Sequence, residues 1–246
     1  MIYCFGDSWG AGAGLNENEN PFGYWLAKDL GAKFLNFSRE GNSYPVIVTQ
    51  IFDNIRNRNE DSPVSEVIKV KSGSFINNKD IVLIVIPPDI RWMEMEANSG
   101  FRSWTVDDDP ERYMSWLGNK TKVWFRYHSS LFTYTIQSAL DSIGCKYLFM
   151  HNYGGEFIID RRFKSLINVD NFLNIKKSLT TLLGGNDEYE SWDLKSDAQH
   201  RQLRKGMYFG EDHMHPNELG HKRITELIKK KICWFSTNRK LSGILK

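Results

Sequence analysis

Apolar and polar residues form blocks along the chain that predict strands and helices in alternation. Short runs dominated by apolar residues are typical of strands that are buried on both faces of a sheet. Such runs occur at Ile2–Phe5, 33–37, 80–86 and 146–150. Apolar residues at helical spacing predict helices over 21–30, 43–58, 122–143 and 216–234. We therefore expect an α/β fold of three layers, in which a central, mainly parallel sheet lies between two layers of helices.

Two stretches lack a clear period, and we expect them to be insertions into this fold. They lie at about 90–120 and 154–210, and the second contains a short amphipathic piece at 172–183. The chain has 246 residues, of which 41% are hydrophobic. A doubly wound domain of this length can bury a single core. The sequence thus predicts one domain over 1–246.

Charge and hydropathy give no support to a nucleic-acid or membrane partner. The formal net charge is +2, which offers no bulk attraction for nucleic acid. We interpret the lysines at 229–231 as a solvated helix end. No stretch reaches the ~18 apolar residues that a membrane-spanning helix requires. Because the first core strand begins at Ile2, we expect a cytoplasmic protein or one released without a signal peptide.

Cysteines and histidines form no strong pattern of a metal or cofactor site. Cys4, Cys145 and Cys233 make no ligand pair, and the first two lie inside apolar runs as small core residues. A disulfide framework is therefore not expected, and a reducing compartment is favoured. His213 beside Asp212 suggests a metal pair, but no second cluster accompanies it. We expect neither a metal nor a cofactor.

The turn after the first strand carries a candidate nucleophile, Ser8, in the segment Gly6–Asp7–Ser8. A serine hydroxyl becomes reactive when a histidine takes its proton, and an acid must orient that histidine. Asp212 and His215 are three residues apart before the last predicted helix, so one loop can present both groups. A helix cap is the alternative role of Ser8. We expect Asp7 only to bond the backbone or a neighbouring loop.

Four segments are expected to meet at one rim of the molecule. In parallel sheets of this kind, ligands bind outside the carboxyl ends of the strands. Ser8, the turn at 38–42 and the loop at 87–89 each follow a predicted strand, and 212–216 precedes the last helix. The sequence therefore predicts a site built from parts of the chain that are far apart.

Three blocks together resemble the SGNH (GDSL-type) hydrolase family. GDSW at 6–9 is similar to the family's nucleophile block, and NFSREGNS at 36–43 to the block whose glycine donates to the oxyanion. DHMHP at 212–216 is similar to the block with the acid and the base. The three blocks stand in the family's order and span most of the chain. The resemblance implies a flavodoxin-like α/β/α fold and a serine ester hydrolase.

The resemblance also implies a role for each matching residue. Ser8 would be the nucleophile, His215 the general base and Asp212 the acid that orients it. The backbone N–H groups of Ser8 and Gly41 would stabilise the oxyanion. Small residues at 10–12 would let the first helical turn approach a bound acyl group.

One block departs from the family pattern. After the central strand the family has Gly-x-Asn-Asp, whose asparagine is a third oxyanion donor. Here Pro87, Pro88 and Asp89 follow the strand, and proline has neither an N–H nor a donor side chain. Arg91 is the candidate replacement because its long, charged side chain can reach back toward Ser8. The alternative for Arg91 is a surface ion pair with Asp89.

The predicted function is that of a serine esterase that releases a small acyl group, such as acetyl, from a carbohydrate or similar ester. Two alternatives stay open: an acyltransferase with the same triad, and a catalytically weak binding or structural module that keeps the fold. The expected partner is a small-molecule or carbohydrate ester, with no nucleic acid and no membrane span. The sequence leaves the oligomeric state open.

Overall fold

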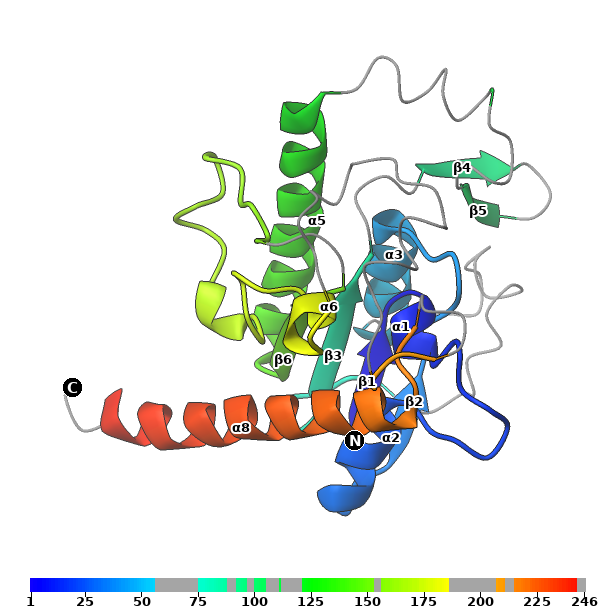
Figure 1. Cartoon of the computed structure of the whole chain (residues 1–246). Coiled ribbons are helices and arrows are strands. Elements are labelled where there is room, and N and C mark those ends of the chain that lie inside the picture. The colour runs from blue at the N-terminus through cyan, green and yellow to red at the C-terminus, as the bar shows by residue number, and fades with distance from the viewer. Residues whose placement is uncertain are drawn as a thin grey trace.

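Four parallel strands form the central sheet of the protein (Figure 1). The computed structural model describes residues 1–55, 75–87, 92–96, 100–104, 111, 121–152, 156–185, 207–210 and 215–242, with backbone alone at 92–96, 100–104 and 234–242. The strands are β1 (Ile2–Phe5), β2 (Phe34–Asn36), β3 (Ile81–Ile86) and β6 (Lys146–His151), in the order β2-β1-β3-β6. All three pairings are parallel. The predicted strands and the predicted parallel sheet are confirmed.

Helices cover both faces of this sheet. On one face α2 (Phe22–Asp29) packs against α8 (Glu218–Ser242), and on the other α3 (Tyr44–Ile55) packs against α5 (Lys122–Ile143). Three shorter elements, α1 (Ser8–Ala11), η1 (Val169–Asn171) and α6 (Leu179–Leu182), complete the described helices. The three-layer α/β/α architecture is therefore confirmed.

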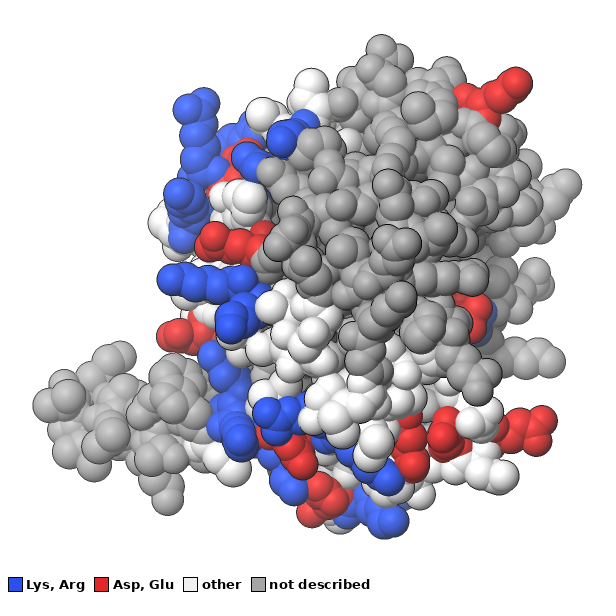
Figure 2. Space-filling model, viewed as in Figure 1, with Lys and Arg blue, Asp and Glu red and all other residues white. Residues whose placement is uncertain are grey.

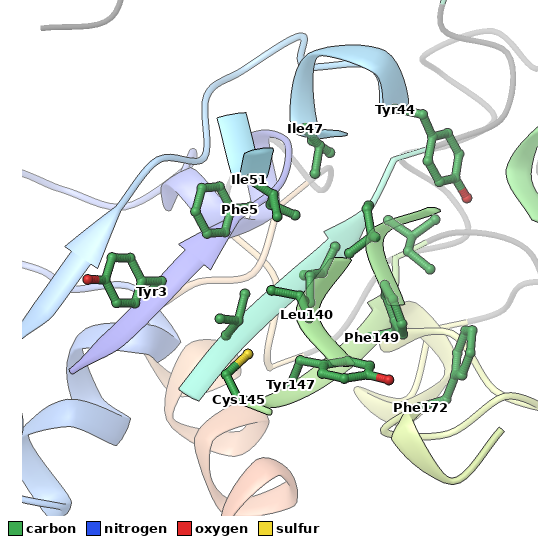
Figure 3. Packing of buried hydrophobic residues seen from close by; sticks show 14 of the residues in the cluster. Tyr3, Phe5, Tyr44, Ile47, Ile51, Leu140, Cys145, Tyr147, Phe149 and Phe172 are labelled. Carbon is green, nitrogen blue, oxygen red and sulfur yellow. The ribbon is translucent and has the colours of Figure 1, made fainter. Parts of the chain in front are cut away.

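Two apolar clusters fill the space between the sheet and its helices. Successive side chains of a strand point to opposite faces, so Tyr3 and Phe5 join the cluster under α3 and α5, whereas Ile2 and Cys4 join the cluster under α2 and α8. Figure 3 shows the first cluster, with Tyr3 and Phe5 on β1 facing the side chains from the helices. The core therefore holds the carboxyl ends of the strands at one rim.

Helix boundaries follow the local capping residues. Helix α5 has the predicted bounds because the Thr121 hydroxyl accepts from the Trp124 N–H, and Gly144 ends the helix with a φ of 69°. Helix α8 begins two residues later than predicted, since the Asn217 side chain accepts from the Gly220 N–H at 2.9 Å and caps it. Pro216 therefore precedes this helix.

The first insertion contains a hairpin that the sequence pattern did not predict. Strands β4 (Trp92–Glu96) and β5 (Gly100–Trp104) pair antiparallel, so the expectation of irregular structure is wrong at these residues. In the second insertion a single parallel bridge joins Phe172 to Phe149 beside β6.

The surface of the described part carries both signs of charge. Figure 2 shows Lys and Arg gathered along one edge of the view, with Asp and Glu between them. On α8, Lys229 forms an ion pair with Asp29 at 2.7 Å, and Arg223 pairs with Glu226 at 2.7 Å. Lys229 and Lys230 are exposed and Lys231 is half-buried. Because α8 continues to Ser242, these lysines lie within the helix, and the expectation that they form its end is wrong. Among the described helices, none combines the length and the apolar content needed to cross a bilayer.

Candidate active site

Ser8 lies in a buried turn at the carboxyl end of β1. Asp7 is the N-cap of α1, because its Oδ1 accepts from the Trp9 N–H at 3.2 Å. The capping role considered for Ser8 is therefore taken by its neighbour, and Ser8 is the first residue of the helical turn. Its side chain is 5% exposed. The turn carries Ser8 at the rim that the parallel sheet makes available for a ligand.

Glycines let this turn pack closely against its neighbours. A Cβ on Gly6 would lie 2.6 Å from Val85 Cβ in β3, and a Cβ on Gly10 would lie 2.4 Å from Ser38 Oγ in the loop after β2. Both distances are too short for non-bonded contacts of a carbon atom with carbon or oxygen. The space beside Gly10 is filled by Ser38, so this glycine serves the packing of the turn against the loop after β2. The expected approach of a bound acyl group to residues 10–12 stays a prediction.

The loop after β2 is hydrogen-bonded to the turn that carries Ser8. The Gly6 carbonyl accepts from the Arg39 N–H at 3.1 Å and from Asn42 Nδ2 at 2.9 Å. Gly41 lies between these two anchors with a φ of 77°, a conformation that favours glycine. Apart from Gly41 and its two neighbours in the chain, no atom of the described residues lies within 4 Å of a Cβ built on Gly41, so its backbone conformation is what calls for glycine. The predicted oxyanion residue thus belongs to a loop bound to the turn of Ser8.

His215 belongs to a segment that contacts the same turn from the other side. The Gly210 N–H donates to the His215 carbonyl at 2.9 Å, and Phe209 bridges to Pro216. The Phe209 ring packs edge-on against Trp9, the residue after Ser8, with ring centroids 6.3 Å apart. The segment that carries the predicted base is therefore anchored to α1.

Two residues with predicted roles in the site lie outside the described residues: the predicted acid Asp212 and the candidate donor Arg91. Pro88, Asp89 and His213, for which the sequence predicts no catalytic role, also lie outside them. The roles of Asp212 and Arg91 stay predictions. Across the described ranges, no three side chains of His, Cys, Asp or Glu gather closely enough to hold a metal ion.

A second histidine lies near His215 and has a structural role. His221 is fully buried in the first turn of α8, where its Nδ1 accepts from the Phe22 N–H at 3.2 Å. Burial, and to a lesser extent the neighbouring His215, lowers the pKa of His221 to about 3. His221 is therefore neutral at physiological pH and supports the start of α2. Its sequence context carried no signal for this role.

Cys4, in the strand that leads into the turn of Ser8, is a poor candidate for the nucleophile. Burial, with a smaller contribution from the negative charge of Asp7, raises the pKa of Cys4 to about 12. A thiol that stays protonated at neutral pH is a poor nucleophile. Ser8 is therefore the candidate for attack at this rim.

Asn152 is a residue of this rim that the sequence reasoning missed. It follows β6 directly and is 1% exposed. Its Nδ2 donates to Asp7 Oδ2 at 2.7 Å across 145 residues of sequence. The one available signal was its place at the carboxyl end of a predicted strand, where polar side chains of a parallel sheet meet.

Comparison with known proteins finds likeness in structure and none in sequence. No protein-family model matches the chain, and no curated protein matches it. Similar solved structures include an acetyl xylan esterase, AlAXEase (TM-score 0.48, 13% identity, 94% of this chain and 98% of that chain). Another is the psychrotrophic esterase EstA from Pseudoalteromonas sp. (TM-score 0.44, 13% identity, 96% and 98%).

A third similar structure is a member of the lipolytic protein G-D-S-L family from Veillonella parvula (TM-score 0.41, 13% identity, 93% of this chain and 96% of that chain). That family is the one that the sequence blocks resemble. At these values the likenesses are distant, and they carry no residue's role over to this chain.

Proposed function

We propose that this protein is a serine ester hydrolase in which Ser8 is the nucleophile, His215 the general base and Asp212 the acid that orients the imidazole. The observation that carries the proposal is the double anchoring of the Ser8 turn. The loop of Gly41 is bound to it through Gly6, and the segment of His215 is bound to it through Trp9. Groups suited to nucleophile, base and oxyanion donor thus belong to segments joined at one rim.

The reaction follows from the chemistry of these groups. Ser8 Oγ attacks the ester carbonyl while His215 takes its proton, and a tetrahedral oxyanion forms. The N–H groups of Ser8 and Gly41 donate to that oxyanion. The alcohol then leaves with the proton from His215, and an acyl-serine remains. Water attacks this ester with His215 as base, which releases the carboxylic acid and restores the Ser8 hydroxyl.

The third oxyanion donor is assigned to Arg91 as part of the proposal. Loss of one donor costs roughly 10²–10³ in turnover, and Pro88, which cannot replace the family's asparagine, has neither an N–H nor a donor side chain. A permanently charged guanidinium would stabilise the developing negative charge. Arg91→Ala is expected to lower turnover at least about tenfold with little change in folding stability. An unchanged rate would leave Ser8 and Gly41 as the donors.

The proposed substrate is a small acyl ester of a carbohydrate or similar alcohol. Chromogenic esters of increasing acyl length test the acyl side, and turnover is expected to fall from acetyl toward long chains. A preference for long chains would contradict the proposal and favour a lipase. Transfer of the acyl group to an added alcohol, faster than to water, would instead identify an acyltransferase.

Labelling with a fluorophosphonate tests the nucleophile directly, since an activated serine displaces the fluoride and becomes a stable phosphonate ester. We expect the label on Ser8 in the wild-type protein and no label in Ser8→Ala. Ser129→Ala is the matched control, because Ser129 is also buried and its hydroxyl donates to the Phe125 carbonyl within α5. An unlabelled wild-type protein would contradict the proposal that the protein is a serine esterase. Equal ester turnover by wild type and Ser8→Ala would contradict it as well.

The choice of base is tested in the same way. His215→Ala is expected to abolish labelling of Ser8, whereas His213→Ala is expected to retain it. The melting temperature of each variant shows that it is folded. If His213→Ala is the unlabelled variant, the base is assigned to the wrong histidine.

A further inference from the structure

Both carboxylate oxygens of Asp7 are held, and from different parts of the molecule. Oδ1 accepts from the Trp9 N–H at 3.2 Å, within the turn that carries Ser8. Oδ2 accepts from Asn152 Nδ2 at 2.7 Å. Asp7 is 0% exposed and Asn152 is 1% exposed, so this contact is shielded from water. A short hydrogen bond to a buried carboxylate is among the stronger contacts in a protein.

The Asn152 side chain approaches from a strand that is not a neighbour of β1. In the sheet, β3 lies between β1 and β6, and Asn152 follows the register pair Ile86 and His151 at the end of these strands. The pair of side chains therefore spans the carboxyl end of β3. At that end of β3 the chain continues with Pro87, which has no N–H to donate.

Asn152 is itself fixed in place. Thr180, a fully buried residue of α6, donates from its hydroxyl to the Asn152 carbonyl at 2.7 Å. Among the described residues the Asn152 Oδ1 atom has no hydrogen-bond partner. A buried amide that leaves its oxygen unpaired bears a free-energy cost. In the described part of the chain, the hydrogen bond of the amide group is the one to Asp7.

We propose that Asn152 is a positioning residue for the nucleophile, which acts by holding Asp7 and through it the turn that carries Ser8. This inference rests on the proposed function, because it concerns the reactivity of Ser8. The turn determines where both the Ser8 hydroxyl and the Ser8 N–H point. A small shift of the turn misplaces the attacking atom and an oxyanion donor together, and such errors reduce rate far more than binding.

Two single substitutions and one exchange test the contact. Asn152→Ala removes the donor, and the labelling rate constant of Ser8 and kcat are expected to fall at least about tenfold with KM nearly unchanged. Asn152→Asp is expected to be worse, since it places a second carboxylate against Asp7. The exchange Asp7→Asn with Asn152→Asp restores one amide–carboxylate bond, and it is expected to recover most of the rate lost in Asn152→Asp.

Asn54 provides a matched control. It is 2% exposed, its Nδ2 donates to the Gln50 carbonyl at 2.7 Å, and its Oδ1 has no partner among the described residues. Asn54→Ala therefore removes a comparable buried amide from α3, away from the Ser8 turn. It is expected to lower the melting temperature as Asn152→Ala does and to leave the labelling rate of the folded protein unchanged.

The outcomes separate this inference from the proposed function. A wild-type protein that the phosphonate does not label at Ser8 overturns the proposed function. A labelled wild type with an Asn152→Ala variant that is labelled equally fast overturns the positioning role alone. If Asn152→Asp does not fold, the test rests on Asn152→Ala and on the exchange variant. The exchange variant is expected to be labelled faster than Asn152→Ala. An exchange variant that is labelled no faster contradicts the inference.

Discussion

The turn that carries Ser8 and the segment that carries His215 are held in different ways. The Ser8 turn is buried, and hydrogen bonds tie it to the loop after β2 and to the residue after β6. Gly6 lets this turn pack directly against β3, where a side chain at this position would overlap Val85. The described part of the segment with His215 is half-buried, and its Phe209 ring packs on Trp9 of α1.

The difference shows that the proposed nucleophile and the proposed base depend on different parts of the fold. Several buried contacts determine the Ser8 turn, so a substitution there disturbs stability and chemistry together. The proposed base, His215, belongs to a loop segment outside the sheet, so its placement can change while the sheet stays intact. Substitutions in the two regions should therefore separate the effects on stability from the effects on rate.

The largest effect is expected from Gly10→Ala in the Ser8 turn. The new Cβ would lie 2.4 Å from Ser38 Oγ, so the turn or the loop after β2 must move. We expect a loss of about 1–3 kcal/mol in the free energy of unfolding and a fall of about 10²-fold in the labelling rate of Ser8. Urea unfolding and fluorophosphonate labelling measure the two quantities.

Removal of the clash provides the control for this prediction. Ser38→Gly takes away both the Oγ and the Cβ atoms that a side chain at Gly10 would meet first. The double variant Gly10→Ala/Ser38→Gly is therefore expected to be labelled faster than Gly10→Ala. If Gly10→Ala alone is labelled at the wild-type rate, the close packing of the turn does not determine reactivity.

A smaller effect on the labelling rate of Ser8 is expected from Phe209→Ala, in the segment that packs beside His215. Phe209 is buried, and its loss leaves a cavity against Trp9 at a cost of about 3–5 kcal/mol. With the anchor gone, the His215 segment is free to shift, and labelling of the folded protein should fall about tenfold. Labelling well below the melting temperature separates this effect from unfolding.

Phe157→Ala is the matched control for Phe209→Ala. Phe157 is buried to a similar degree and packs on Phe172 in the cluster under α3 and α5, with ring centroids 5.2 Å apart. Its loss should lower stability by a similar amount and leave the labelling rate of the folded protein unchanged. Equal losses of rate in the two variants would show that Phe209 acts through general stability alone.

Among these predictions, His221→Gln is expected to have the smallest effect on the labelling rate. Its expected effect is on the pH dependence of stability. Burial lowers the pKa of His221 to about 3 in the folded protein, against the ordinary histidine value of 6.5, so the unfolded chain binds an additional proton between these values. The free energy of unfolding should therefore fall as the pH drops from about 6.5 toward 3, with a contribution of up to about 1.4 kcal/mol per pH unit.

Unfolding in urea at several pH values checks this contribution. His221→Gln lacks the titrating group and keeps an acceptor for the Phe22 N–H, so its stability should depend less on pH in this window. Labelling of Ser8 at neutral pH should be unchanged. An identical pH dependence in the two proteins would contradict a buried neutral His221.

Local sequence pattern predicted much of the sheet and its helices. The apolar runs of β1, β3 and β6 and the caps of α5 at Thr121 and Gly144 are signals within a few residues, and each element has nearly the predicted bounds. The Gly-Asp-Ser turn after β1 was also readable, because a strand that ends in small residues places the next side chain at the rim. The hairpin of β4 and β5 was not predicted, since its pairing depends on a partner strand and not on its own period.

What the sequence determined by itself is the order of buried strands and amphipathic helices, and the candidacy of Ser8, Gly41 and His215. The tertiary structure decided which distant residues hold that site together. Asp7 contacts Asn152 across 145 residues of sequence, and Trp9 contacts Phe209, which lies near the other end of the chain. Gly10 is a glycine because of Ser38, a neighbour in space and not in sequence. The physical reason is that periodicity and capping act within a few turns of chain, whereas packing and buried hydrogen bonds depend on which segments the folded sheet brings side by side.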